Sequence, residues 1–290
     1  MEHTDIFIRY NKFLQRVNYS ESSILSHCEA VKRFSRWLDV TVEEVTPTVL
    51  YQYLGYLHHR RLKPTTINSN LHRIKRFYDY LYYEEKVKIP NPVKPAYKQK
   101  MPKPLPKFLS NREVSILFNS IKNKRDYTMF MLMLRCGLRV EEVVNLTIPS
   151  IDFEDSSILV LRGKFRKDRV VYMGEEARHA LIDYLNYRQR YKKGNVFLVQ
   201  KGKSKGNPVS IRGVQKRIEF YAKKTGVTVS CHRLRHTMAT QLLNAGAMLA
   251  TVQEILGHDC IYSTQRYAKV SNTKVRKDYF SAMKRIKAMQ

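Results

Sequence analysis

The chain of 290 residues has few acidic side chains. Only 25 Asp and Glu residues stand against 53 Lys and Arg residues, so the formal net charge is +28 and the pI is about 10.0. This excess goes well beyond what solubility requires, and it creates a long-range field that attracts polyanions. Nucleic acid is the first candidate for that polyanion, and an acidic membrane surface is the second.

The sequence also lacks long hydrophobic runs, a secretory leader and a disulfide pattern. The longest apolar run, Met129 to Leu134, ends at Arg135 and is far too short to span a bilayer. The N-terminus has no basic stretch followed by an apolar core, so no signal peptide is expected. The four cysteines are scattered through a chain long enough to bury its own cores, which indicates reduced, structural thiols. We therefore expect a cytoplasmic protein with no membrane partner.

A basic, proline-rich segment divides the chain. Residues 90–106 contain no acidic residue, and their prolines resist both helix and sheet, so we expect an extended segment beside a phosphate backbone. The predicted divisions are an N-terminal DNA-binding domain at 1–89, a linker at 90–107 and a C-terminal domain at 108–290. The linker residues predicted to contact DNA are Lys98, Lys100 and Lys103.

The first domain shows only helical patterns. Apolar residues recur at helical spacing from Ile24 to Leu38 and from Ile67 to Leu81, and Thr46-Pro47 is typical of a helix start with Pro at the first position. A helical bundle follows from these patterns. The last of these helices also has a basic face, and with this net charge we favour a DNA-facing surface over an ordinary solvated one. The residues predicted to contact DNA there are Arg73, Lys75 and Arg76.

The second domain is mixed. A helix ends at Gly137, another begins at Arg139, and further helices are predicted beyond residue 210. Two β-rich runs, 158–161 and 170–172, are separated by a polar turn and predict a hairpin. The fold class expected for the whole chain is mostly α, with a small antiparallel β-sheet in the C-terminal domain.

The stretch Cys231-His232-Arg233-Leu234-Arg235-His236 carries the strongest chemical signal. His232 and Arg235 are three residues apart at a predicted helix start, so both can face one bound anion, and the exposed amides add to the attraction. Arg139 and Glu142 have the same spacing, so the carboxylate can orient a neighbouring cation or imidazole. Arg can grip two phosphate oxygens at once, and a Tyr hydroxyl held beside such a clamp is a candidate nucleophile.

A zinc site is the alternative for this stretch. His236 lies four residues after His232, and Cys231, His258 and Cys260 could add ligands. A metalloprotease helix requires Glu at position 233, where this chain has Arg, and an arginine-rich site repels a cation. We therefore favour no metal and a buried structural role for His236.

Taken in order, these motifs resemble those of the tyrosine site-specific recombinases, the phage-integrase and Xer-like group. The family pattern is Arg, Lys, His-x-x-Arg, Leu-Gly-His and Tyr, and the resemblance extends from Phe108 to about Val270. It implies catalytic roles for six residues and a supporting role for Glu142. The six residues are Arg139, Lys164, His232, Arg235, His258 and Tyr267.

The turn from Gly163 to Arg169 resembles the family turn Gly-Lys-Gly-Asn-Lys-Glu-Arg, whose first Lys is the general acid. Lys164 matches that position, but Phe165 and Arg166 replace a glycine and an asparagine. Lys167 therefore stays an alternative acid. A further alternative is that the four basic residues of the turn contact only phosphates.

The resemblance implies strand cleavage through a 3′-phosphotyrosyl intermediate, with no cofactor. It also implies duplex DNA with a specific core site, a homotetramer on two sites and a C-terminal helix that docks into a neighbouring protomer, and it leaves room for an accessory or partner recombinase. Two alternatives remain: a type IB topoisomerase-like nicking-closing enzyme, and a non-catalytic basic DNA-binding protein.

Overall fold

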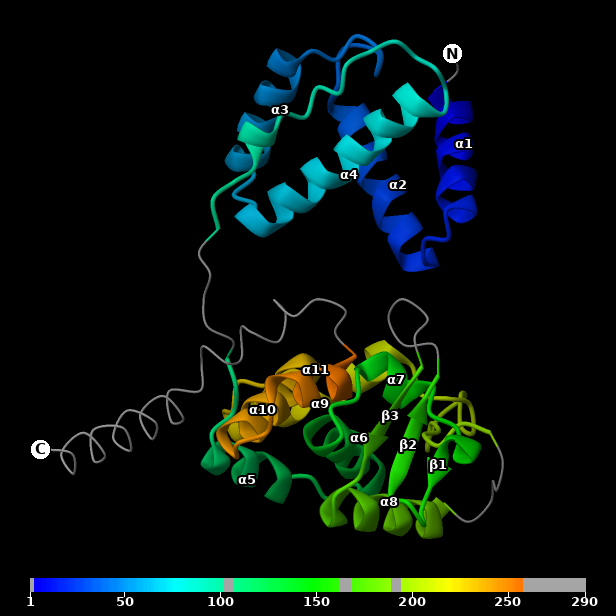
Figure 1. Ribbon diagram of the computed structural model, residues 1–290, viewed down its shortest axis with the longest axis vertical. Helices are drawn as coiled ribbons and strands as arrows, with labels where there is room; N and C mark the ends of the chain where they lie inside the picture. The colour runs from blue at the N-terminus through cyan, green and yellow to red at the C-terminus, as the bar shows by residue number, and fades with distance from the viewer. Residues whose placement is uncertain (1–2, 102–106, 162–167, 189–193, 258–290) are drawn as a thin grey trace, which may run out of the picture. The chain divides into compact units, whose positions relative to one another are not determined.

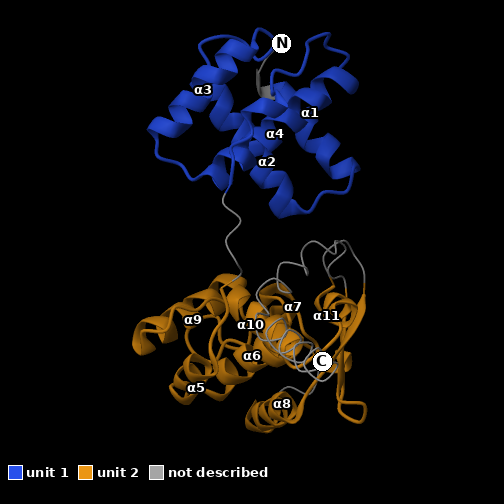
Figure 2. Ribbon diagram, turned by 60° about the vertical axis from the view of Figure 1, so that its left-hand side comes forward, with its two compact units in different colours: residues 1–103 blue, residues 104–290 orange. Residues whose placement is uncertain are grey.

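The computed structural model describes residues 3–101, 107–161, 168–188 and 194–257. The chain forms two compact units, residues 1–103 and 104–290 (Figure 2). Within the described residues, no helix has both the length and the apolar character needed to cross a membrane.

The first unit is a bundle of four helices followed by a short 3₁₀ turn. Its elements are α1 (His3–Arg16), α2 (Glu21–Trp37), α3 (Pro47–His59), α4 (Pro64–Tyr83) and η1 (Pro95–Tyr97). The hydroxyl of Thr46 accepts from the amide of Val49 and caps α3, as Thr46-Pro47 predicted. The sequence patterns did not identify α1, which buries Ile6, Tyr10 and Leu14 against the other helices.

Residues 90–101, which were predicted to be part of an extended linker, are hydrogen-bonded to the helices of the first unit. The side chain of Asn91 donates to the carbonyl oxygen of Lys75 (2.9 Å), and the hydroxyl of Tyr97 donates to that of Pro47 (3.2 Å). The amide of Gln99 donates to Asn68 Oδ1 at 2.8 Å. Proline removes backbone donors here, but side-chain amides and an aromatic ring between the prolines fasten the segment to α3 and α4.

The second unit is mixed, with α6 in its middle (Figure 1). Its helices are α5 (Asn111–Asn119), α6 (Lys124–Arg135), α7 (Val140–Val144), η2 (Ile148–Ser150), α8 (Glu175–Arg188), α9 (Ile211–Thr225), α10 (Cys231–Asn244) and α11 (Leu249–Leu256). Both α8 and α10 pack on α6, and α11 contacts α10 and β3. The wholly buried residues of α6, including Phe130 and Leu132, form the centre of this core.

The sheet is small and antiparallel, as predicted. Its strands are β1 (Ile151–Asp152), β2 (Ser157–Val160) and β3 (Arg169–Tyr172), in the order β1-β2-β3. Side chains alternate between the faces, so Ile158 and Val171 are buried, whereas Leu159 and Tyr172 are exposed. The same alternation puts Arg169 on the buried face, two residues before Val171. The predicted antiparallel pairing of the two runs is therefore confirmed. Its second strand, β3, places the charged residue Arg169 on the buried face.

Candidate active site

Two arginines converge on the carboxyl end of α11. Arg139 immediately precedes α7, and Arg235 lies in the second turn of α10. Arg139 Nη2 donates to the carbonyl oxygens of Leu256 and Gly257, each at 3.1 Å, and Arg235 Nη2 also donates to the Leu256 carbonyl. The two guanidinium groups therefore share an acceptor, although they come from distant parts of the sequence.

The turn before Arg139 requires glycine. Gly137 follows the end of α6 with φ of +65°, the left-handed conformation of a helix-terminating glycine, as its position in the sequence predicted. A Cβ atom there would collide with the side chain of Met238 on α10. Arg235 donates to the Gly137 carbonyl oxygen, so this close approach also brings Arg235 beside Arg139.

The carboxylate of Glu142 contacts Arg139 and lies close to Arg235. It accepts from the backbone amide of Arg139 (2.7 Å) and from Arg139 Nη1 (2.8 Å), and it lies 4.0 Å from Arg235 Nη1. Burial alone raises the pKa of Glu142, but hydrogen bonds and charge from Arg169, the Arg139 amide and Arg235 outweigh that effect and lower it to about 2. Glu142 is thus a fixed anion at any ordinary pH.

Arg169 is the member of this cluster that the sequence patterns did not single out. Its Nη1 and Nη2 donate to the two oxygens of Glu142, each at 2.8 Å, and its Nε donates to the Ile255 carbonyl oxygen at 2.8 Å. A role limited to phosphate contact does not fit a side chain so engaged. The signal that could have found it is the strand alternation, which places Arg169 on the same face as Val171.

His232 lies beside the two arginines at the start of α10. Although His232 is exposed, desolvation by its neighbours, together with the charges of Arg235 and Arg139, lowers the pKa of its ring, which favours the neutral form. Its ring makes an edge-on contact with the half-buried His236, with centroids 4.1 Å apart. Ser230 caps the helix by accepting from the amide of Arg233.

Several predicted residues lie outside the described part of the chain. They are the nucleophile candidate Tyr267 with its competitor Tyr262, the turn lysines Lys164 and Lys167, the histidine His258 and the linker residue Lys103. The described residues stop at Gly257, whose left-handed backbone (φ +56°) ends α11 as the sequence predicted.

The described donors do not form a metal site, and the candidate ligands His258 and Cys260 lie outside the described residues. Among the described residues, no group of three or more His, Cys, Asp or Glu side chains is arranged to hold one. Burial raises the pKa of Cys231 to about 11, which disfavours the thiolate that a metal would need. The carboxylate of the arginine cluster, Glu142, already has three guanidinium groups around it, and their positive charge would repel a metal cation.

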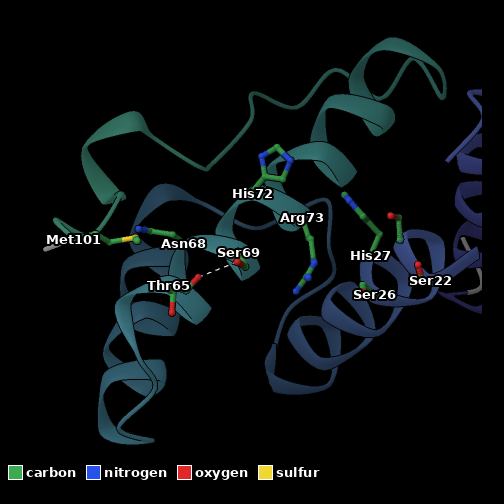
Figure 3. A pocket seen from close by; sticks show the side chains of 10 residues that line it. Ser22, Ser26, His27, Thr65, Asn68, Ser69, His72, Arg73 and Met101 are labelled. Carbon is green, nitrogen blue, oxygen red and sulfur yellow. Dashed lines mark hydrogen bonds between the residues drawn. The ribbon is translucent and has the colours of Figure 1, made fainter. Parts of the chain in front are cut away.

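A polar pocket of about 590 Å³ opens between α2 and α4 in the first unit. Figure 3 shows His72 and Arg73 of α4 lying across from His27 of α2. His27 is buried and hydrogen-bonded to Tyr10 (3.2 Å). Burial, with help from Arg73, His72 and Arg76, lowers its pKa to about 4, so it is neutral. Hydroxyl and amide groups supply most of the remaining wall, from Ser22, Ser23, Ser26, Thr65, Asn68 and Ser69.

The three basic residues predicted on α4 have different surroundings. Arg73 lines the pocket, and the described residues give it neither a hydrogen bond nor an ion pair. Lys75 pairs with Asp79 at 3.0 Å, and Arg76 lies over the ring of Phe13. The linker residues Lys98 and Lys100 are exposed.

Known proteins match both units. The Phage integrase family matches residues 107–274, and the phage integrase N-terminal SAM-like domain matches residues 6–86. Tyrosine recombinase XerC of Staphylococcus aureus (strain USA300 / TCH1516) is 34% identical over 282 residues, which cover 93% of each chain. XerC of Staphylococcus epidermidis (strain ATCC 12228 / FDA PCI 1200) is 32% identical over 281 residues, covering 93% of this chain and 94% of its own.

Solved structures also match this chain. The crystal structure of XerA recombinase is 27% identical, with a TM-score of 0.55, and the match covers 97% of this chain and 99% of that one. The Tn1549 transposon integrase in complex with transposon right end DNA shares the fold, with a TM-score of 0.76 at 20% identity over 90% of this chain and 94% of its own. With family matches on both units and relatives at 34% identity along nearly the whole chain, this protein belongs to the phage integrase family and is a Xer-like tyrosine recombinase.

Proposed function

We propose that this site-specific recombinase cuts and rejoins duplex DNA at a specific core site, with Tyr267 as the nucleophile. The Tyr267 oxygen attacks the scissile phosphorus, a 3′-phosphotyrosyl bond forms, and the 5′ oxygen leaves and takes up a proton. A 5′ hydroxyl from another strand then reverses the step. Each transesterification replaces one phosphoester bond with another, so the chemistry needs no external energy source and no cofactor.

One observation carries this proposal: Arg139 and Arg235 converge at the end of α11, beside His232. The end of this helix, Leu256, lies eleven residues before Tyr267 in the sequence. In the structure the carbonyl oxygens of Leu256 and Gly257 accept hydrogen bonds from these arginines. An anionic phosphate oxygen is a stronger acceptor for guanidinium than a neutral carbonyl, so a substrate phosphate would compete well for these donors.

The proposed roles follow from charge and protonation. Arg139, Arg235 and His258 hold the non-bridging oxygens, where preorganised donors stabilise the charge that develops. Neutral His232 accepts or orients the tyrosine proton, and Lys164 protonates the leaving 5′ oxygen, with Lys167 as the alternative. Glu142 keeps Arg139 in place.

The pocket between α2 and α4 is the proposed DNA contact of the first unit. It presents Arg73, His72 and a row of short polar side chains, which can bind phosphate oxygens and base edges alike. Exposed Lys98 and Lys100, together with Lys103, would add sequence-independent phosphate contacts. Lys75 and Arg76 contribute less in this proposal, because Asp79 and Phe13 already engage them.

Assembly completes the proposal. Four copies on two DNA sites would exchange strands, with the segment from Val275 to Met289 of each copy docked on its neighbour. Its apolar residues at helical spacing, including Phe280 and Met283, support such docking. A second recombinase or an accessory protein could take part in the same assembly. The proposal places the protein in the cytoplasm and leaves open whether its DNA site lies on a chromosome, plasmid, transposon or phage.

A nicked suicide substrate tests the chemistry. Wild-type protein should become covalently attached to a 3′ phosphate, and Tyr267→Phe should give no adduct while it keeps its DNA affinity, since only one oxygen is lost. Tyr262→Phe is the matched control and should react at the wild-type rate. An inactive Tyr262→Phe with an active Tyr267→Phe would contradict the assignment. Exchange of strands between two labelled duplexes separates recombination from topoisomerase-like nicking and closing.

A further inference from the structure

Arg169 is held within the protein by three side-chain hydrogen bonds. Each of its nitrogens donates to a protein oxygen at 2.8 Å: Nη1 and Nη2 to Glu142, and Nε to the Ile255 carbonyl. Its side chain is only 8% exposed. Because this side chain is nearly buried and points its donors at Glu142 and the end of α11, we look for its role in what it holds.

Arg169 balances the charge of Glu142. Nη1 and Nη2 of Arg169 donate to both carboxylate oxygens, whereas the guanidinium of Arg139 reaches that carboxylate through Nη1 alone and that of Arg235 stays 4.0 Å away. Three guanidinium charges and one carboxylate leave two formal positive charges. Because Arg169 is hydrogen-bonded to both oxygens of Glu142, it neutralises most of the carboxylate charge. The positive charges of Arg139 and Arg235 then stay available to a phosphate transition state.

Arg169 also fixes the end of α11. Its Nε holds the Ile255 carbonyl, and a Cβ atom on Gly257 would lie only 3.0 Å from Arg169 Cδ. The carbonyls of Leu256 and Gly257, which accept from Arg139, lie on this same turn. The side chain of Arg169 therefore holds both Glu142 and the end of α11, both of which contact Arg139.

We propose that Arg169 is a positioning residue, which acts through Glu142 to hold Arg139 and Arg235 in the geometry that receives the scissile phosphate. This inference rests on the proposed cleavage chemistry, and it assigns to Arg169 no contact with DNA. A misplacement of about 1 Å at such a clamp is enough to cost about a hundredfold in rate.

The test compares three substrates in single-turnover cleavage by Arg169→Gln and Arg169→Lys. On an ordinary phosphodiester, Arg169→Gln should be about a hundredfold slower than wild type. A methylphosphonate at the scissile position replaces one charged oxygen with a methyl group, so it depends less on the clamp, and the loss should shrink to less than about tenfold. A 5′-thio leaving group needs little protonation and should restore nothing. Lys supplies one compact charge without a planar fork, so Arg169→Lys should recover only part of the rate.

A double-mutant cycle with Glu142→Gln checks the route. If Arg169 acts through Glu142, the double variant should be no slower than the slower single variant. Arg217→Gln is the matched control, because Arg217 also pairs with a buried carboxylate, Asp126 at 2.6 Å, but away from the clamp. It should lower thermal stability without changing the ratio of the rates on the phosphodiester and the methylphosphonate. That ratio, measured on one preparation, does not depend on how much of the protein is folded.

Three outcomes would overturn the inference: equal losses on phosphodiester and methylphosphonate, rescue by the 5′-thio substrate, or strictly additive losses in the cycle. Wild-type protein that forms no adduct at all would instead refute the proposed function. Wild-type protein that reacts alongside a fully active Arg169→Gln refutes only the role of Arg169.

Discussion

The two units use basic side chains in opposite ways. In the first unit, Arg73 and His72 line a pocket of about 590 Å³, and their polar atoms are available to a ligand. In the second unit, the donors of Arg139 and Arg169 are held by Glu142 and by backbone carbonyls. The contrast separates binding from catalysis. A surface that grips DNA gains from accessible donors, whereas a surface that stabilises a transition state gains from donors already fixed in place.

Electrostatics follow the same division. The buried histidine of the pocket, His27, stays neutral because its surroundings lower its pKa to about 4. The buried carboxylate of the arginine cluster, Glu142, stays charged because its partners lower its pKa to about 2. Burial opposes charge in both places, and only the second has enough partners of opposite sign to overcome it.

The largest expected effect is on the fixed cluster. Arg235→Gln should slow single-turnover cleavage by about a thousandfold, because removing a preorganised donor from a site that stabilises charge has this magnitude. Arg233→Gln lies on the same helix and is the control. Arg233 donates to the carbonyls of Thr228 and Phe108 and should cost less than about tenfold. Similar losses for both would mean that helix stability, and not the clamp, sets the rate.

Acid should weaken the fixed cluster next. The pKa of Glu142 lies below its ordinary value of 4.5 in the folded protein, so its contribution to stability is present above about pH 4.5 and is lost as the pH falls toward 2. A shift of this size corresponds to about 3 kcal/mol. Denaturant titrations of wild type and Glu142→Gln should therefore converge between pH 4.5 and pH 2.

The control for this pH dependence is Glu219→Gln. Glu219 pairs with Arg212 on the surface, where both side chains are more than half exposed. Removing this surface pair should change the free energy of unfolding by less than about 1 kcal/mol at each pH tested. If the gap between Glu142→Gln and wild type is the same at every pH, the charge of Glu142 is not what stabilises the cluster.

Within the first unit the expected effects are smaller. Arg73→Ala should weaken binding to a core-site duplex about tenfold, or about 1.4 kcal/mol, because an accessible guanidinium is lost. Lys75→Ala, two residues away on the same helix, should weaken binding by about twofold or less, since Lys75 is already paired with Asp79. Fluorescence anisotropy at fixed salt measures both. A larger effect from Lys75 would place the DNA on another face of α4.

The smallest effect is expected in the linker. Lys98→Ala and Lys100→Ala should each lower the log–log salt slope of DNA binding by about one and weaken specific and random duplexes alike, because phosphate contacts carry no sequence information. Titrations across several salt concentrations would show this. A loss confined to the core-site duplex would indicate base contacts instead.

The sequence by itself determined the local features of this protein. The cap at Thr46-Pro47, the glycine turns at Gly137 and Gly257, and the two runs of the hairpin each depend on neighbours within a few residues. The family pattern likewise picked out Arg139 and Arg235, which the structure brings to one point. Even so, α1, α5 and α8 were missed, although Ser110 and Glu113 form a capping box at the start of α5.

Only the tertiary structure decided which basic residues are fixed and which are available. Arg169 comes from a strand, Arg139 from the turn before α7 and Arg235 from α10, and all three lie around Glu142. Arg139 also reaches the Gly257 carbonyl, which is 118 positions away in the sequence. In the same way, Phe13 of α1 lies against Arg76 of α4, whereas Arg73 stays on the pocket wall. Short-range patterns report propensity and periodicity. The partner of a charged side chain depends on which distant elements pack beside it, and packing is set by the whole core.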